Sequence, residues 1–264
     1  MFGSYVLPIL VISISGLLAA IILVIASKFM AVKVDETFEA VRECLPGVNC
    51  GACGYAGCDE YAHKVAAGGV KTNLCVPGGD ETSKKISQVL GVEFEDVVEQ
   101  AAFVRCSGDC GATDYIMDYR GRQTCAACNN FYQGRGSCSH ACLGFGDCVR
   151  VCQYDAIHIE NGVAVVDREK CTGCGMCARE CPNDLIAVAD ATKAYYVGCS
   201  STDKGAFTRK VCSNGCIGCK KCERTCQHGA IKVENNLASI DTTLCVNCGE
   251  CFGVCPTGAI KKAF

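Results

Sequence analysis

Cysteine is the residue whose number and spacing carry the chemistry of this sequence. The chain has 27 cysteines among 264 residues. Three segments share the spacing C-x2-C-x2-C-x3-C and a fourth is a looser version of it; these are residues 171–181, 216–226, 245–255 and 138–152. Such a run supplies three thiolates from one tight loop, with a fourth from a distant segment, and it is typical of proteins that bind cubic 4Fe-4S clusters.

The fourth cysteine of each run is expected to leave its own loop. In two-cluster proteins of this kind it binds the cluster of the other run. This exchange predicts four ligand sets: Cys138, Cys142, Cys148 and Cys181; Cys152, Cys171, Cys174 and Cys177; Cys216, Cys219, Cys222 and Cys255; and Cys226, Cys245, Cys248 and Cys251.

The runs are themselves repeated as a block. A shift of 74 residues superimposes the cysteines from 138 to 181 on those from 212 to 255, and it carries Cys125 onto Cys199. We therefore expect two tandem ferredoxin-like modules, at residues 125–190 and 191–264. One ligand stays open, because Cys219 falls opposite Phe145 whereas Cys212 falls opposite Cys138, so Cys212 could replace Cys219.

Zinc and disulfide bonds are the alternatives for so many thiols. Zinc sites usually pair two C-x2-C knuckles across a long spacer, and a disulfide framework needs no fixed run. The spacing therefore favours iron-sulfur clusters. Such thiols persist in a reducing compartment, which indicates the cytoplasm.

An uncharged apolar segment occupies residues 6–26. At helical rise it is about 31 Å long, enough to cross the hydrocarbon core of a bilayer, and it exceeds the apolar region of a signal peptide. Lys28 and Lys33 follow it and no basic residue precedes it. The positive-inside rule then predicts a single-pass inner-membrane anchor at residues 1–30, with the rest of the chain on the cytoplasmic side.

Residues 31–80 predict a separate small iron-sulfur domain. A short helix over 34–46 ends at Pro46, and the pattern Cys50-x2-Cys53-x4-Cys58 follows, with Cys75 as a remote fourth thiol. Glycines between these cysteines would let backbone N–H groups approach a cluster. A single zinc ion is the alternative, and Cys44 lies outside the pattern.

Residues 81–124 predict a linker with helical periodicity between Asp80 and Phe103. Four further thiols, Cys106, Cys110, Cys125 and Cys128, form a candidate sixth site. A structural role is the alternative, because Cys125 is matched by Cys199. The sequence thus predicts five 4Fe-4S clusters, with a sixth left open.

Other cofactors lack a motif in this sequence. No P-loop, dinucleotide-binding or nucleophile-elbow pattern occurs, and the four histidines are not at ligand spacing. We expect no flavin, NAD or haem in this chain, no nucleic-acid partner and no self-contained substrate site. Electron transfer is the predicted chemistry.

The whole arrangement resembles the RnfB family, which belongs to the Rnf ion-translocating electron-transport complex. The resemblance rests on the apolar segment, the residues from Asn49 to Cys58, the segment from Gly144 to Cys152 and the segment from Cys199 to Cys222. It implies an α+β protein that takes electrons from reduced soluble ferredoxin and relays them to flavin- and cluster-bearing subunits, while membrane subunits move sodium ions or protons.

Some points of this interpretation stay open. The chain carries a second module that shorter members of the family lack, which leaves its electron uptake site undecided. A basic cluster at Lys204, Arg209, Lys210, Lys220 and Lys221 could dock an acidic ferredoxin. The remaining classes are an anchored polyferredoxin subunit of another oxidoreductase and a non-redox metal-binding adaptor or scaffold.

Overall fold

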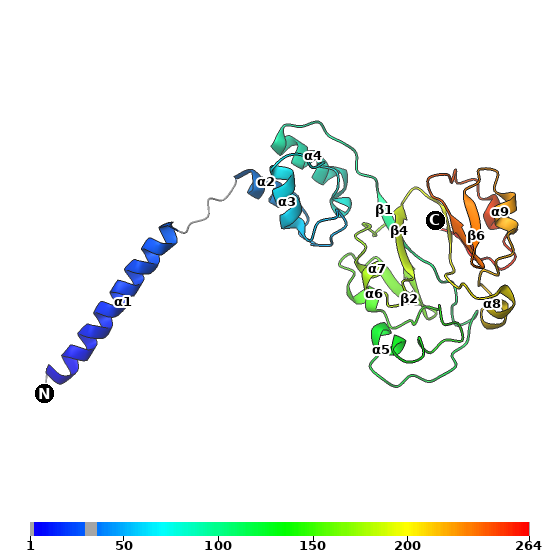
Figure 1. The fold of residues 1–264 in the computed structure, drawn as a ribbon, viewed down its shortest axis with the longest axis horizontal. Helices are drawn as coiled ribbons and strands as arrows, with labels where there is room; N and C mark the ends of the chain where they lie inside the picture. Colours follow the sequence, from blue (N-terminus) through cyan, green and yellow to red (C-terminus); the bar gives the residue numbers. More distant parts are fainter. Residues whose placement is uncertain (1–2, 30–35, 264) are drawn as a thin grey trace.

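The computed structural model describes residues 3–29 and 36–263 and contains both helices and strands (Figure 1). Helix α1 (Gly3–Phe29) includes an 18-residue window, Leu10–Ser27, with a mean hydropathy of 2.7 and no buried residue. It is the one helix in the described ranges that is long and apolar enough to cross a membrane. Lys33 and the side chain of Lys28, which carried the topology prediction, lie outside the described residues.

The Cys50 module is a small helical domain. Helices α2 (Glu36–Cys44), α3 (Cys58–Ala66) and α4 (Gly79–Leu90), with the short 3-10 helix η1 (Val76–Gly78), surround one apolar core. Its centre is Val41, Tyr61, Val65 and Ile86, each at most 1 % exposed. The predicted helix before Pro46 is confirmed as α2.

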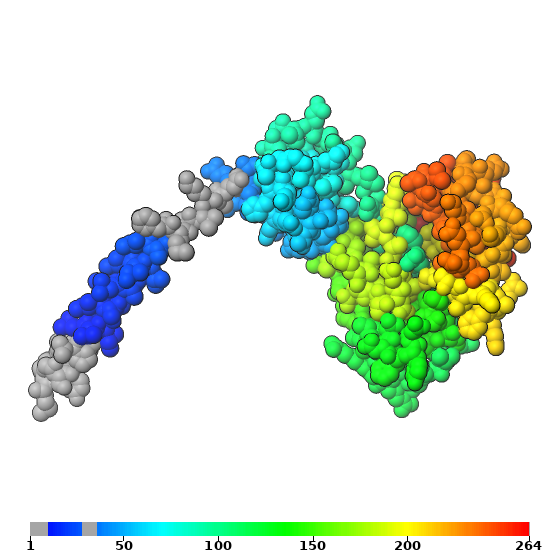
Figure 2. All heavy atoms as spheres, viewed as in Figure 1, coloured from blue at the N-terminus to red at the C-terminus, as the bar shows by residue number. Residues whose placement is uncertain are grey.

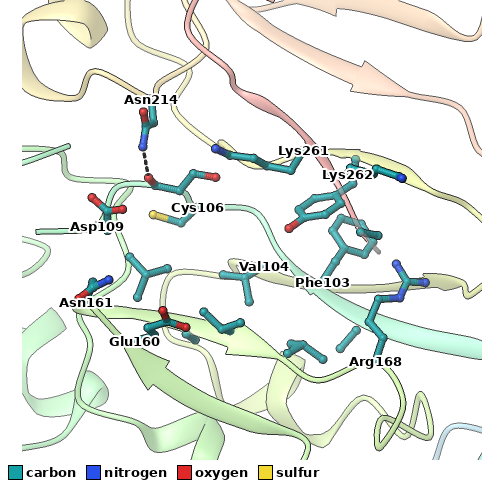
Figure 3. Close-up of a pocket in the computed structure, with 18 residues that line it drawn as sticks. Phe103, Val104, Cys106, Asp109, Glu160, Asn161, Arg168, Asn214, Lys261 and Lys262 are labelled. Atoms are coloured by element: carbon teal, nitrogen blue, oxygen red, sulfur yellow. Dashed lines mark hydrogen bonds between the residues drawn. The ribbon is translucent and has the colours of Figure 1, made fainter. Parts of the chain in front are cut away.

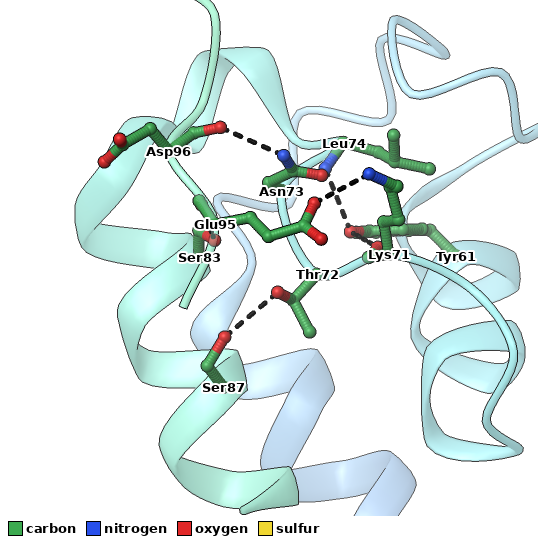
Figure 4. Close-up of polar contacts among 9 residues, drawn as sticks. All are labelled: Tyr61, Lys71, Thr72, Asn73, Leu74, Ser83, Ser87, Glu95 and Asp96. Carbon is green, nitrogen blue, oxygen red and sulfur yellow. Dashed lines mark hydrogen bonds and ion pairs between the residues drawn. The ribbon is translucent and has the colours of Figure 1, made fainter. Parts of the chain in front are cut away.

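Helix was expected as far as Phe103, and that expectation was wrong. Helix α4 ends at Leu90 because Gly91 takes a left-handed conformation, with φ of 66°. The chain then returns across the module, where Ser83 donates a hydrogen bond to the Glu95 carbonyl at 3.0 Å and Asn73 donates to the Asp96 carbonyl at 2.9 Å (Figure 4). The last apolar residues of the pattern belong to strand β1 (Gln100–Val104).

Two units with the same order of elements follow. In the first unit, β1 pairs antiparallel with β4 (Ile186–Asp190), and β2 (Ile157–Glu160) pairs antiparallel with β3 (Val163–Val166). Helix α6 (Asp147–Arg150) precedes β2 in sequence, and helix α7 (Met176–Glu180) lies between β3 and β4. In the second unit, β5 (Tyr195–Val197) pairs with β8 (Ile260–Lys262) and β6 (Ile231–Glu234) with β7 (Leu237–Ile240); its helices are α8 (Gly205–Val211), α9 (Lys221–Thr225) and α10 (Glu250–Val254).

Strand pairing shows where the structural repeat begins. Val104 pairs with Ile186, and Val197 pairs with Ile260. Val197 lies 93 residues after Val104, but Ile260 lies only 74 after Ile186. The first unit therefore has 19 additional residues, and they lie between Cys106 and Cys138. This segment, residues 107–137, is called the insert loop; it contains helix α5 (Cys125–Asn129) and lies in the lower, green part of Figures 1 and 2.

Tyr61 gives a test of how the Cys50 module is held together. Its buried hydroxyl donates to the Lys71 carbonyl at 2.8 Å and accepts from the Leu74 N–H at 3.3 Å, directly before Cys75 (Figure 4). Burial raises the pKa of Tyr61, so the hydroxyl keeps its proton as a donor. We expect Tyr61→Phe to lower the free energy of unfolding by about 1–3 kcal/mol, because it leaves two polar backbone groups without their partner.

Denaturant titration followed by far-UV circular dichroism would measure this loss. Tyr55→Phe is the matched control, because Tyr55 is half-buried beside Tyr61, at 5.5 Å between ring centroids. No hydrogen bond of its hydroxyl occurs within the described residues. Equal denaturation midpoints for the two variants would contradict the role given to the Tyr61 hydroxyl.

Candidate iron-sulfur sites

The four thiols predicted for the N-terminal domain come together in the structure; we call Cys50, Cys53, Cys58 and Cys75 the Cys50 site. Burial raises the pKa of Cys75 to about 11, and the neighbouring Cys58, Cys50 and Cys53 add to this rise. Asn49 fixes the start of α3 by accepting a hydrogen bond from the Cys58 N–H at 2.8 Å. The loop of three thiols is thus closed by a remote fourth.

A second predicted set, Cys152, Cys171, Cys174 and Cys177, also comes together and is called the Cys171 site. Burial raises the pKa of Cys177 to about 11, with contributions from Cys171, Cys174 and Cys152. The Ala102 N–H donates to Cys171 Sγ at 3.3 Å, so strand β1 forms part of this site. Backbone N–H donors of this kind stabilise thiolate sulfur.

The second unit holds two sets as predicted from the local spacing. Cys216, Cys219, Cys222 and Cys255 line one cavity of ≈ 360 Å³, the Cys216 site. Cys219, and not Cys212, is the thiol in this cavity. Cys226, Cys245, Cys248 and Cys251 form the Cys245 site, where burial raises the pKa of Cys251 and the other three thiols add to the rise.

The remaining set of the first unit differs from the predicted one. A cavity of ≈ 390 Å³ is lined by Cys125, Cys142, Cys148 and Cys181, which we call the Cys142 site. Cys138 does not line it. The second unit has Cys219 as the middle thiol of its first run, but the first unit has Phe145 at the equivalent position. Cys125 of the insert loop lines the cavity in place of that thiol.

Hydrogen bonds to Asp147 fix the position of Cys125 in the insert loop. The buried carboxylate of Asp147 on α6 accepts hydrogen bonds from the Cys125 N–H at 2.9 Å and the Ala126 N–H at 3.0 Å, and it pairs with Arg150. A carboxylate at a helix N-terminus satisfies backbone donors that the helix leaves free. Arg135, also in the insert loop, lies over the ring of Phe145, with its Cζ 4.4 Å from the ring centroid.

Cys138 lies in a different place, at the boundary between the two units. A cavity of ≈ 340 Å³ is lined by Cys106, Cys138, Cys199 and Cys212. The candidate sixth set inferred from sequence is therefore not brought together: Cys106 and Cys125 line different cavities, Cys110 is exposed and Cys128 is fully buried beside Cys125. Cys44 donates to the Ala40 carbonyl within α2.

The chemistry of these donor sets fits four-iron clusters. Each set offers four thiols around a central space, and several of their sulfurs accept backbone N–H groups, as Cys152 does from Ala156 and Cys181 from Leu185, both at 3.4 Å. Within residues 3–29 and 36–263, no three His, Cys, Asp or Glu side chains converge as they would around one metal ion.

Comparison with known proteins agrees with the cysteine geometry. Three protein-family models match the chain: one described as "Putative Fe-S cluster" at residues 45–77, a 4Fe-4S binding domain at 164–187 and a 4Fe-4S dicluster domain at 215–259. The dicluster match covers both runs of the second unit, while the match in the first unit covers only its second run. The chain is an iron-sulfur protein.

Relatives extend over most of the chain. The RnfB-type protein of an ion-translocating oxidoreductase complex from Methanosarcina acetivorans is 41 % identical over 86 % of each protein. The chain belongs to the RnfB family. Its counterparts in a proton-translocating ferredoxin:NAD(+) oxidoreductase complex from Clostridium ljungdahlii and in a Na(+)-translocating one from Acetobacterium woodii are 38 % and 36 % identical over 92 % and 91 % of this chain, and over 86 % and 73 % of the relatives.

Family membership sets the coarse role of this RnfB-family protein. It transfers electrons through iron-sulfur groups within an oxidoreductase complex, with the other subunits of that complex as its partners. Its apolar helix α1 and its membrane-complex relatives indicate association with a membrane.

Asp147 provides a test of the Cys142 site. Hydrogen bonds to a buried charge contribute about 1.5–3 kcal/mol, so we expect Asp147→Ala to lower the free energy of unfolding by about that amount. It also frees α5, and we expect the purified protein to lose about four irons because Cys125 is displaced. Calorimetry and iron analysis would measure both effects.

Asp118→Ala is the control, since Asp118 lies in the same insert loop with its side chain 74 % exposed and paired with Arg120. We expect it to change stability by at most about 1 kcal/mol and to leave the iron content unchanged. An Asp147→Ala protein with full iron content would show that Cys125 is not held for a cluster.

Proposed function

We propose that this protein is the electron relay of an Rnf-type complex: it accepts electrons from reduced ferredoxin and passes them to membrane and flavin subunits, which couple the redox drop to Na⁺ or H⁺ translocation. Iron-sulfur clusters supply one-electron transfer when bound. One observation carries the proposal. Neighbouring thiol sites lie next to one another from the Cys50 site through the first unit, and again within the second unit.

The series begins at the Cys50 site, which adjoins the Cys171 site. A Cβ placed on Gly51 would lie 3.6 Å from Arg179 Nη1, which belongs to α7 of the first unit. Tyr154 lies between the two sites: burial raises its pKa, and thiols of both sites, Cys174 and Cys50, add to the rise. The small N-terminal domain is thus packed with its ligand loop toward the first unit.

The series continues within the first unit, and a second series lies within the second unit. Burial raises the pKa of Cys148 to about 12, and its neighbours include Cys177 of the Cys171 site. In the second unit, the Cys216 and Cys245 sites share one apolar core that contains Cys222 and Cys251. The end of the series is exposed, because Cys248 reaches the surface and Leu244 and Val246 around it are 51 % and 58 % exposed.

The second unit also carries the proposed ferredoxin surface, beside the Cys216 site. Lys204, Arg209, Lys210, Lys220 and Lys221 are all exposed, on or beside helices α8 and α9 next to the Cys216 site. Phe207 is 50 % exposed among them. A basic rim around an apolar residue favours an acidic protein partner. We place this surface on the cytoplasmic side of a single-pass anchor, and we place flavin, NAD and ion transport in other subunits.

Metal analysis of the protein purified without oxygen tests the iron-sulfur relay directly. We expect at least about 20 irons with equal acid-labile sulfide, and a partial, reversible loss of their visible absorbance on addition of reduced ferredoxin. Zinc in place of iron in freshly isolated native protein would overturn the relay and favour a structural adaptor.

Charge reversal tests the docking surface. We expect Lys210→Glu/Lys221→Glu to lower the rate of reduction by ferredoxin at least about tenfold at low salt and much less at high salt, because salt screens exposed charges. Lys220 is left unchanged because it pairs with Glu223 and has a positive φ of 59°. Stopped-flow absorbance over a series of ionic strengths would measure the rate.

Lys64→Glu is the control for the docking test. Lys64 is exposed on α3, at the opposite end of the series of sites. If this variant slows reduction and the double variant does not, ferredoxin docks at the Cys50 module instead.

A further inference from the structure

We propose that Cys106, Cys138, Cys199 and Cys212 bind one more 4Fe-4S cluster, which joins the two units. We call this set the seam site. The inference rests on the proposed function insofar as the chain's other thiol sets bind such clusters. The four ligands of the seam site do not form a C-x2-C-x2-C-x3-C run, so the spacing of the cysteines does not predict this set.

The four thiols face one enclosed space. Cys106, Cys138, Cys199 and Cys212 all line the same cavity, as the thiols of the Cys142 site and of the Cys216 site each do. A Cβ placed on Gly108 would lie 3.4 Å from Cys212 Sγ and 3.7 Å from Cys106 Sγ.

The seam site has an internal two-fold symmetry that follows the structural repeat. Cys106 follows Val104, the last residue of β1, by two residues, and Cys199 follows Val197, the last residue of β5, by two. Cys106 Sγ accepts a hydrogen bond from the Cys142 N–H at 3.4 Å, and the equivalent backbone group near Cys199 is the Cys216 N–H.

The other two ligands obey the same symmetry. Cys138 and Cys212 precede Cys142 and Cys216, respectively, by four residues. Each unit therefore contributes one equivalent pair of thiols. Two copies of a pair placed face to face supply the four ligands of a cubic cluster, as two halves of an interface do.

Hydrogen bonds around the site hold the units at this distance. Asn214 donates to the Ser107 carbonyl at 2.8 Å, Thr113 donates to the Val211 carbonyl at 2.7 Å and Ser213 N–H donates to the Ala112 carbonyl at 3.0 Å. Figure 3 shows the first of these contacts beside Cys106, at the edge of a cleft lined by both units. The insert loop thus reaches across to the second unit next to the proposed ligands.

The seam site also accounts for the thiols that the runs leave over. With it, six sets of four include every cysteine except Cys44, Cys110 and Cys128. The 74-residue shift aligns Cys125 with Cys199, but the two thiols have different roles. Cys125 supplies the thiol that the first unit lacks at Phe145. Cys199 has no such task because Cys219 is present.

The location of the seam site gives the proposed cluster a role in electron transfer between the two units. Cys106 contacts the Cys142 site through a hydrogen bond from the Cys142 N–H, and Cys199 lies near the Cys216 N–H of the Cys216 site. The seam site therefore lies between the last thiol set of the first unit and the first set of the second. It would complete the electron path and fasten the two units together.

Replacing Cys44, Cys110 and Cys128, which belong to none of the six sets, tests the seam site without changing any of its four ligands. We expect the wild-type protein, purified whole and without oxygen, to contain about 24 irons and equal sulfide. We expect Cys44→Ala/Cys110→Ala/Cys128→Ala to contain the same amount, which would require all 24 remaining cysteines as ligands. A wild-type count of about 20 would overturn the seam site and leave the relay intact, whereas zinc without iron would overturn both.

A second variant removes two of the four proposed ligands, both from the second unit. We expect Cys199→Ser/Cys212→Ser to lose about four irons and to split the calorimetric unfolding of the two units into separate transitions, because the cross-link between them is gone. Full iron content in this variant would overturn the seam site. If it loses more iron through misfolding, the triple variant decides: a fall to about 20 irons there overturns the proposal.

Discussion

Each cubic cluster requires four thiolates around one centre, and the fold of the two units depends on this constraint. Their sheets have only two strands each, and the helices beside the clusters have four or five residues. Such elements are marginal in isolation. The apolar core of the second unit contains Cys216, Cys222 and Cys251 themselves. We therefore expect metal binding and folding to be coupled in this protein, as in other small metal-binding domains.

The two units show how a repeat can diverge and keep its ligands. In the first unit Phe145 stands where the second unit has Cys219, and the insert loop brings Cys125 to the same cavity. Asp147 holds the start of α5, and Arg135 covers Phe145. The loop also contacts the second unit through Thr113. One insertion thus brings a fourth thiol to this cavity and contributes to the boundary between the units.

The order of the sites gives the chain a direction. An apolar helix precedes the Cys50 module, and the opposite end presents exposed thiol, apolar and basic side chains around α8, α9 and α10. A one-electron carrier works between two partners, and this arrangement offers a separate surface to each. The relatives from ferredoxin:NAD(+) oxidoreductase complexes share this chain over most of its length.

The sequence by itself determined the kind of chemistry, the apolar N-terminal helix, the family and the loops of three thiols, because these depend on spacing within short segments. Helix α2 also follows from local pattern. Only the tertiary structure decided that Cys125 and not Cys138 lines the Cys142 site, that Cys138 faces Cys199 and that β1 belongs to the first unit. Spacing fixes a local loop but leaves open which distant thiol completes it, and that choice depends on how the units pack against each other.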